Sequence, residues 1–126
     1  MVETKTMFKK IYLAAEIGCN HMGDIKLAKH LIDQAKYCGA DYVKFQKRDN
    51  KILFTKKEFN SKHPVPNNSF GKTYGLHREH LELNFQQHKI IAAYCKKKKI
   101  GYACSVWDVN SAKIISKISK KYIKVP

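Results

Sequence analysis

Short apolar runs alternate along the chain with longer segments whose apolar residues recur at helical spacing. The apolar runs predict four β-strands, at residues 11–17, 40–46, 100–105 and 122–125. The helically spaced segments predict three helices, at residues 24–38, 85–98 and 109–118. Because the strands alternate with the helices and are almost continuously apolar, the sequence predicts an α/β domain with a parallel sheet.

The first predicted helix has clear ends. Asp24 is a good N-cap, and Gly39 is a natural C-cap. Between them, one helix face is apolar and is expected to pack on the core through Ile25, Leu27, Ala28, Leu31, Ile32 and Ala35. The second helix is expected to face inward with Ile90, Ile91, Ala93, Tyr94 and Cys95. Strand, helix and strand up to residue 46 have the order of a right-handed βαβ unit.

A long segment without clear periodicity, residues 47–84, separates the second strand from the second helix. Prolines and polar residues interrupt it, so we expect mostly loop, with a short helix at residues 76–83. Loops of this length in compact domains usually form lids or binding segments.

The composition fits one folded domain, since 44% of the 126 residues are hydrophobic. No apolar run approaches the roughly 20 residues of a membrane span, and the first ten residues lack the apolar core of a signal peptide. The four cysteines form no CxxC pair and no metal-ligand spacing. We therefore expect reduced thiols, a cytoplasmic location and no membrane contact.

The net charge of +15 raises the possibility of nucleic-acid binding. Most of the excess is lysine spread along the chain, and two arginines are few for base or phosphate recognition. The run Lys96–Lys99 follows a helical pattern and is expected to be a solvated helix end. We therefore expect no nucleic-acid partner, and steeply salt-dependent DNA binding would contradict this expectation.

Polar side chains stand at the carboxyl ends of all four predicted strands: Glu16, Lys44 with Gln46, Ser105, and Lys124. Burying an unpaired charged side chain costs roughly several kcal/mol, so a buried charge is expected to have a partner. In α/β folds, ligands bind at this end of the strands. Lys44 and Lys124 could hold a phosphate or carboxylate there. The alternatives are a structural glutamate and lysines that extend to solvent.

Other candidate residues give weaker signals. His77 and His80 are helically spaced, but two histidines alone are a weak metal signal, and we expect a packing role. Cys19 and Cys104 are expected to be small core residues.

Several motifs in register resemble the N-acetylneuraminate (sialic acid) synthase family. They are A-A-E-I-G-C-N-H-M-G-D from residue 14, G-A-D-Y-V-K-F-Q-K-R from residue 39, G-K-T-Y-G-L-H-R-E-H-L-E-L from residue 71, and C-S-V-W-D from residue 104. The later Y-I-K-V-P resembles the next strand of the family. The resemblance covers nearly the whole chain.

The resemblance implies a (β/α)8 TIM barrel that condenses phosphoenolpyruvate with N-acetylmannosamine or a related amino sugar. The products would be a nonulosonic acid and phosphate. Glu16 resembles the glutamate that contacts the sugar near its reacting carbonyl. Phosphoenolpyruvate-binding roles are implied for Lys44, Gln46, Ser105 and Lys124. A homodimer and a divalent metal, Mn²⁺ or Mg²⁺, are implied for the full-length family.

A TIM barrel typically takes about 250 residues, so residues 1–126 are expected to be the N-terminal half of the synthase domain, with about four strands. The resemblance places the metal ligands and a small antifreeze-like domain outside this sequence. We therefore expect that this chain alone is inactive. The alternative is a non-catalytic remnant, or a half-barrel that still binds a phosphorylated ligand.

Overall fold

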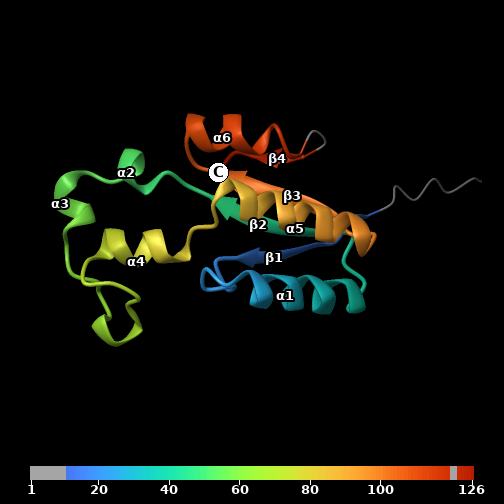
Figure 1. The fold of residues 1–126 in the computed structure, drawn as a ribbon, viewed down its shortest axis with the longest axis horizontal. Coiled ribbons are helices and arrows are strands. Elements are labelled where there is room, and N and C mark those ends of the chain that lie inside the picture. The colour runs from blue at the N-terminus through green and yellow to red at the C-terminus, as the bar shows by residue number, and fades with distance from the viewer. Residues whose placement is uncertain (1–10, 120–121) are drawn as a thin grey trace, which may run out of the picture.

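The computed structural model describes residues 11–119 and 122–126 (Figure 1). Its strands are β1 (Ala14–Gly18), β2 (Tyr42–Lys47), β3 (Gly101–Val106) and β4 (Ile123–Lys124). The longer helices are α1 (Ile25–Tyr37), α4 (Tyr74–Leu81), α5 (Phe85–Lys97) and α6 (Val109–Ile115). Between β2 and α4 lie α2 (Asn50–Leu53), α3 (Lys56–Phe59) and a 3₁₀ turn, η1 (Pro66–Asn68).

The four strands form one sheet in the order β1-β2-β3-β4, and every neighbouring pair is parallel. Strand order therefore follows chain order, with one helix between β1 and β2 and between β3 and β4, and the long segment followed by α5 between β2 and β3 (Figure 1). The predicted α/β domain with a parallel sheet is confirmed.

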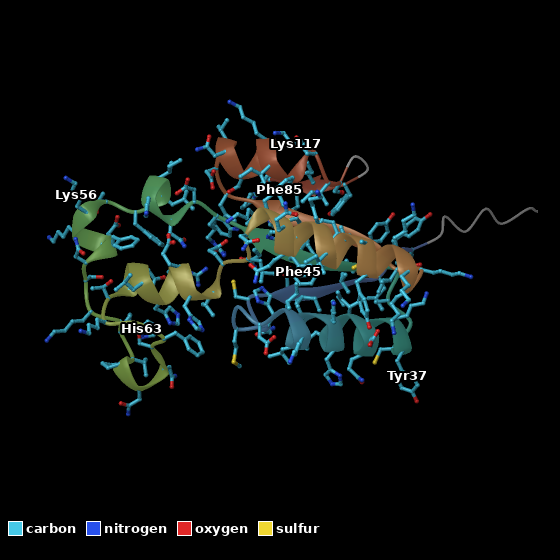
Figure 2. The ribbon with its side chains drawn as sticks, in the orientation of Figure 1. Tyr37, Phe45, Lys56, His63, Phe85 and Lys117 are labelled. Carbon is cyan, nitrogen blue, oxygen red and sulfur yellow. The ribbon has the colours of Figure 1, made fainter. Side chains whose placement is uncertain are left out.

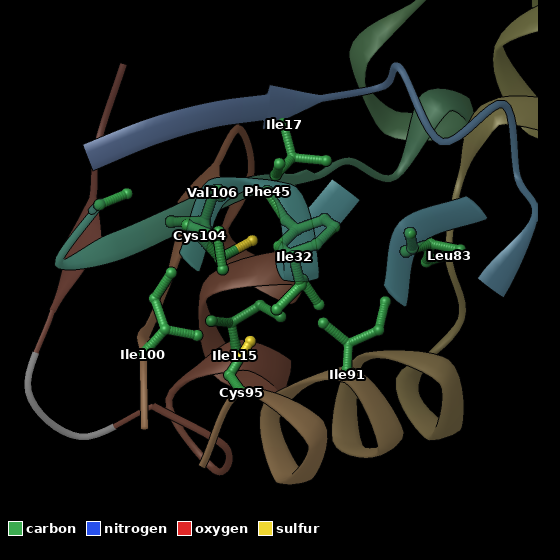
Figure 3. Close-up of a cluster of buried hydrophobic side chains, with 14 residues drawn as sticks. Ile17, Ile32, Phe45, Leu83, Ile91, Cys95, Ile100, Cys104, Val106 and Ile115 are labelled. Atoms are coloured by element: carbon green, nitrogen blue, oxygen red, sulfur yellow. The ribbon is translucent and has the colours of Figure 1, made fainter. Parts of the chain in front are cut away.

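The hydrophobic core lies between one face of the sheet and three helices. Figure 3 shows Ile32 of α1, Ile91 of α5 and Ile115 of α6 in one cluster with the sheet residues Phe45 and Cys104. Because side chains alternate along a strand, this cluster uses one set of strand positions and leaves the other set on the opposite face. The opposite face, which we call the inner face, carries the polar residues that the sequence analysis singled out.

Helix α1 has the ends that the sequence predicts. The Asp24 side chain accepts hydrogen bonds from the amides of Lys26, at 2.6 Å, and Leu27. Gly39 follows the last helical turn with a φ of +85°, which an L side chain rarely adopts. These caps set the length of the helix that connects β1 with β2.

Two details of the sequence prediction are wrong. Residues 11–13 lie outside β1, and Ile11 is 90% exposed, so apolar character there does not reflect burial. On α5, Ile90 and Ala93 face solvent, whereas Ile91 and the polar His88 are buried. The inward face of α5 is therefore rotated relative to the prediction, because His88 takes a core position.

The segment between β2 and α5 lies beyond the carboxyl ends of the strands (Figure 1). Lys56 and His63 mark its outer part, away from the sheet (Figure 2). It contains more helix than the sequence predicts, and its main helix covers residues 74–81 rather than 76–83. Side-chain caps support its short helices, including a reciprocal capping box between Thr55 and Glu58 on α3.

Candidate functional site

Three of the polar residues predicted at the strand ends are in direct contact on the inner face. Glu16 and Lys44 are register partners on β1 and β2, and the Lys44 Nζ forms an ion pair with Glu16 Oε2. The same Nζ donates a hydrogen bond of 3.0 Å to Ser105 Oγ on β3. The Lys44 side chain is only 17% exposed, whereas that of Glu16 is 50% exposed. The ammonium therefore lies between three strands, and the carboxylate remains open to solvent.

Gln46 and Lys124 extend this group along the sheet. Gln46 pairs with Ser105, and Ser105 pairs with Lys124. Since residues paired across parallel strands share a face, Lys124 lies on the inner face beside Ser105. Ser105 is buried, and Lys124 is exposed. The structure thus brings all five predicted residues to one face, near the carboxyl ends of the strands.

The end of β1 brings its backbone close to this group. The register shifts between Glu16 and Gly18, which pairs with Phe45. Gly18 has a φ of +56°, and a Cβ there would lie 3.4 Å from Gln46 Nε2 and 3.5 Å from Glu16 Oε1. Glycine therefore serves both the left-handed turn and the close approach of the two side chains.

Arg48 follows β2 and is held by three kinds of contact. Its Nη2 donates to Gln46 Oε1, and its guanidinium lies 4.5 Å from the centre of the Trp107 ring. Its Nη1 lies 3.7 Å from Glu82 Oε1. Stacking and ion pairing together restrict where the charged group can move.

Glu82 ties the end of the long segment to β2. Its Oε2 lies 3.3 Å from Lys47 Nζ and accepts a hydrogen bond of 3.1 Å from the Arg48 amide. One carboxylate thus serves two cations, Lys47 and Arg48. Arg48 and Glu82 are not among the site residues predicted from the sequence. The direct adjacency of Arg48 to the V-K-F-Q strand was a usable signal, whereas Glu82 had none.

Asp108 links the exits of β2 and β3. It is the N-cap of α6, accepting from the Ser111 amide at 2.7 Å, and its Oδ2 also accepts from the Asp49 amide at 2.8 Å. Partial burial raises the pKa of Asp108, but hydrogen bonds from Ser111 and Asp49 outweigh this effect and lower it overall. The Asp108 carboxylate therefore has a structural role, because it connects the start of α6 with the segment after β2.

The two cysteines expected in the core differ. Cys104 is fully buried, and burial raises the pKa of its thiol to about 12, so it is a packing residue as predicted. Cys19 is only partly buried and lies at the end of β1, where Arg48 Nη1 approaches its sulfur to 3.6 Å and Arg78 Nη2 to 3.8 Å. The prediction that Cys19 is a core residue is wrong, because the chain turns outward after Gly18.

His77 and His80 have the packing role that the sequence analysis favoured. Both rings stack on Phe70, with centroid distances of 5.7 and 4.6 Å. His77 Nδ1 also accepts a hydrogen bond from the Phe70 amide, and burial lowers the pKa of His77. The two histidines therefore stabilise the fold of the long segment.

The inner face offers a set of groups that suits an anion with several oxygen atoms. It combines the ammonium groups of Lys44 and Lys124 with a hydroxyl group on Ser105 and an amide on Gln46. Lysines and neutral donors of this kind bind phosphates and carboxylates. The exposed Glu16 carboxylate adds a hydrogen-bond acceptor for a second, polyhydroxylated molecule.

The chain is similar in sequence to known proteins of one family. The model of the NeuB family matches residues 31–126. The N-acetylneuraminate-9-phosphate synthase of Mus musculus is 38% identical over 118 residues, covering 90% of this chain and 32% of the relative. The synthase of the same name from Drosophila melanogaster is 36% identical over 115 residues, covering 91% of this chain and 31% of the relative. The chain thus spans about a third of the length of these relatives.

A solved structure shows the same fold. The N-acetylneuraminic acid synthetase of Leptospira borgpetersenii superposes with a TM-score of 0.74 at 21% identity, over 93% of this chain and 36% of that chain. This agreement confirms that the described sheet and helices correspond to part of a TIM barrel. Within the described ranges, no helix has the length and apolar character needed to cross a membrane.

Proposed function

Because this chain belongs to the NeuB family, we propose that it is the N-terminal part of a synthase that condenses phosphoenolpyruvate with N-acetylmannosamine or a similar amino sugar. The products would be a nonulosonic acid and phosphate. The names of the mouse and fruit-fly relatives support this reaction class. The observation that carries the proposal is the Lys44 ammonium between Glu16 and Ser105 on the inner face.

In this proposal, the donor occupies the cationic part of the inner face. Lys44 and Lys124 offset the charge of the phosphate and carboxylate groups of phosphoenolpyruvate, while Ser105 and Gln46 provide neutral hydrogen bonds. These groups come from three neighbouring strands of a rigid sheet, so they hold the donor in one orientation. Positioning of this kind lowers the entropic cost of bringing the enol carbon to the acceptor carbonyl.

Glu16 is proposed to contact the acceptor sugar. Its carboxylate is half exposed and shares the Lys44 ammonium with Ser105. A donor anion at Lys44 would compete with Glu16 for the ammonium, which would leave the carboxylate able to accept hydrogen bonds from sugar hydroxyl groups. Its position beside the donor suits contact near the reacting carbonyl.

The divalent metal implied by the resemblance has no fitting ligand set among the described residues. No group of three histidine, cysteine, aspartate or glutamate side chains there could hold a metal ion. The Glu16 carboxylate already faces Lys44, and Asp108 caps α6. We therefore derive no step of the reaction through a metal bound by these residues.

A second candidate function is binding without turnover. The five proposed substrate residues all lie in this chain, whereas the residues described here do not form a metal site. A half-barrel with these residues would still take up phosphoenolpyruvate or a similar phosphorylated ligand. Since residues 1–126 alone are expected to be inactive, the two functions are separated by phosphate release from a longer protein that contains this sequence, in the presence of donor, N-acetylmannosamine and Mn²⁺.

Titration of the chain with phosphoenolpyruvate, followed by amide chemical shifts, tests the proposal. We expect saturable binding, and Lys44→Ala should weaken it by about tenfold or more, because a charge-assisted hydrogen bond is lost. Lys117→Ala is the matched control, since Lys117 is exposed and lies beyond the end of α6 (Figure 2). Equal affinities of the Lys44→Ala and wild-type chains would contradict the assignment of Lys44.

A further inference from the structure

A cavity of about 280 Å³ lies on the helix side of the sheet, beyond the end of β2. Residues of α2, α4 and α6 line it together with the chain that leaves β2. Lys47 forms part of its wall, and strand alternation puts Lys47 on the same side as the core residue Phe45, away from the inner face. None of the five residues assigned to the proposed substrates is among the described residues that line it. The cavity is therefore separate from the donor site.

One carboxylate oxygen in the wall of this cavity is buried without a hydrogen bond. The Glu82 side chain is only 10% exposed, and its Oε2 is engaged by Lys47 and by the Arg48 amide. Its Oε1 has no hydrogen-bond partner among the residues that the structure describes, and Arg48 Nη1, at 3.7 Å, is beyond hydrogen-bond distance. A buried acceptor without a donor is costly, so a ligand that donates to Glu82 Oε1 would be favoured.

Two further charges in the wall have opposite signs and stand apart from each other. Lys51 lies on α2, and Glu79 lies on α4, three residues before Glu82 and on the same side of the helix. Within residues 11–119 and 122–126, neither the Lys51 ammonium nor the Glu79 carboxylate forms an ion pair within 4 Å. Opposite charges that line one cavity without touching suit a molecule that carries the complementary charges at its two ends.

The wall formed by α6 has no charge. It contributes the buried Ser111, the exposed Asn110 and the apolar side chain of Ile114. Over the whole lining, three cations are matched by three carboxylates: Lys47, Arg48 and Lys51 with Asp49, Glu79 and Glu82. The cavity thus matches a small molecule that has one group of each charge, no net charge and an apolar part.

We propose that this cavity binds an α-amino acid with an apolar side chain. The ammonium group donates to Glu82 Oε1 and lies beside Glu79. The carboxylate lies beside Lys51, and the side chain contacts Ile114. An ammonium group has only donors, and its hydrogen bond to a carboxylate is stronger than one between neutral groups. The site goes beyond the proposed synthase function and uses none of its substrate residues.

A lone cation or a lone anion fits this cavity less well. A metal ion at Glu82 would lie beside the cations Lys47 and Arg48, and no set of three metal-binding side chains is found in the described part of the chain. A phosphate would meet the carboxylates of Glu79 and Glu82. An amino acid avoids both repulsions, because its positive group faces the acidic wall and its negative group faces Lys51.

Titration of the chain with L-valine, followed by amide chemical shifts, tests this site. We expect saturable shifts centred on residues that line the cavity, such as Lys51, Glu79 and Ser111. Isobutylamine lacks the carboxylate of L-valine, and 3-methylbutanoate lacks the ammonium group. Each should bind at least about tenfold more weakly than L-valine, because each loses a charge-assisted hydrogen bond.

Two variants distinguish the two ends of the ligand. Glu79→Gln should weaken L-valine binding by about fivefold but leave the affinity for 3-methylbutanoate unchanged. Lys51→Gln should weaken L-valine binding by about fivefold but leave the affinity for isobutylamine unchanged. Lys56→Gln is the matched control, since it removes an exposed charge on the outer part of the same segment (Figure 2), and it should bind L-valine like the wild-type chain.

Several results would overturn this site. They are the absence of saturable shifts with L-valine, equal binding of L-valine and either analogue, and unchanged L-valine affinity in Glu79→Gln and Lys51→Gln. Shifts centred on Lys44 and Ser105 would also overturn it, because L-valine would then occupy the donor site. Phosphoenolpyruvate binding without L-valine binding would leave the proposed function intact, whereas L-valine binding at the cavity without phosphoenolpyruvate binding would support the site and contradict that function.

Discussion

His88 is a titratable side chain placed inside the core. It is 0% exposed, its Nδ1 lies 2.8 Å from the Tyr102 hydroxyl, and its Nε2 is buried without a hydrogen-bond partner among the described residues. Burial, with smaller contributions from Lys47 and His21, lowers the pKa of His88 to about 3. The folded protein therefore holds this ring neutral at pH values where the unfolded chain protonates it.

This difference predicts that the free energy of unfolding falls with acidification. In the unfolded chain, His88 becomes protonated as the pH falls below its pKa of 6.5. In the folded chain, it stays neutral down to about pH 3. The free energy of unfolding therefore falls progressively between these two pH values. At about 1.36 kcal/mol per pKa unit, the loss should reach about 3 kcal/mol at pH 4 and approach about 5 kcal/mol below pH 3. Urea unfolding followed by circular dichroism between pH 7 and pH 4 measures the slope.

His88→Phe should flatten that slope, even if it lowers stability at neutral pH by removing the contact with Tyr102. The control is His30→Gln, because His30 is exposed on α1, and it should leave the slope unchanged. The lowered pKa values of His21 and His77 would still leave some acid sensitivity in the variant. A slope as steep in His88→Phe as in the wild-type chain would exclude this explanation.

Site residues on the strands could be predicted from the sequence, whereas site residues in or beside the long segment could not. Glu16, Lys44 and Ser105 could be placed together from sequence, because strand alternation and parallel order fix both face and end. Arg48, Arg78 and Glu82 could not, because their positions depend on how the long segment folds back. The same dependence explains Cys19, whose sequence neighbours are apolar but whose backbone turns away from the core.

At the scale of elements, α4 packs on the turn after β1, and this packing places the Arg78 guanidinium 3.8 Å from the Cys19 sulfur. Gly23 has a φ of +77°, and its missing side chain leaves the space that the carbonyl of His80 occupies. Gly39 also has a positive φ, of +85°, but a Cβ there meets nothing within 4 Å. An alanine at either position would have a strained backbone, but only an alanine at position 23 would also clash with a neighbouring atom.

Gly23→Ala should destabilise the chain by about 2–4 kcal/mol, since left-handed strain and overpacking add. Gly39→Ala should cost only about 1 kcal/mol, because it carries the strain without the contact. Urea denaturation of both variants measures the difference. If the two variants lose equal stability, the close contact between the turn and α4 is not a stabilising constraint.

Helices with strong periodicity were predictable to within a residue or two, as α1 shows. The short helices of the long segment were not, because their helical turns depend on caps and tertiary contacts more than on an apolar face. The Thr55 and Glu58 capping box was a readable local signal for α3. On α5, the buried His88 misled the prediction, since a polar residue at a core position shifts the apparent apolar face.

At the scale of the whole molecule, the sheet of the described chain has two outer strands, β1 and β4. Near the amino ends of its strands, Tyr12, Tyr42 and Tyr122 form a row of rings, with centroid distances of 6.1 and 6.2 Å. Ile11 and Leu13 beside them are exposed. Unpaired strand edges next to apolar surface favour pairing between chains.

We therefore expect the chain to self-associate as its concentration rises. Sedimentation velocity across a concentration series should show a growing fraction of larger species. Leu13→Asp should reduce this fraction, since a charge next to the edge strand opposes pairing. Lys56→Asp, which changes an exposed charge on the outer part of the long segment, away from the sheet (Figure 2), provides the comparison. A single monomeric species at every concentration would rule out association through the sheet.

The order of the strands also bears on how the chain is made. Because each described strand after β1 pairs with the one that precedes it in sequence, a new strand emerging from a ribosome finds its neighbour already synthesised. No strand has to wait for a distant partner or insert between two others, which keeps loop closure short and assembly sequential. As each further helix and strand is added to the sheet, the strands that have already paired keep their neighbours.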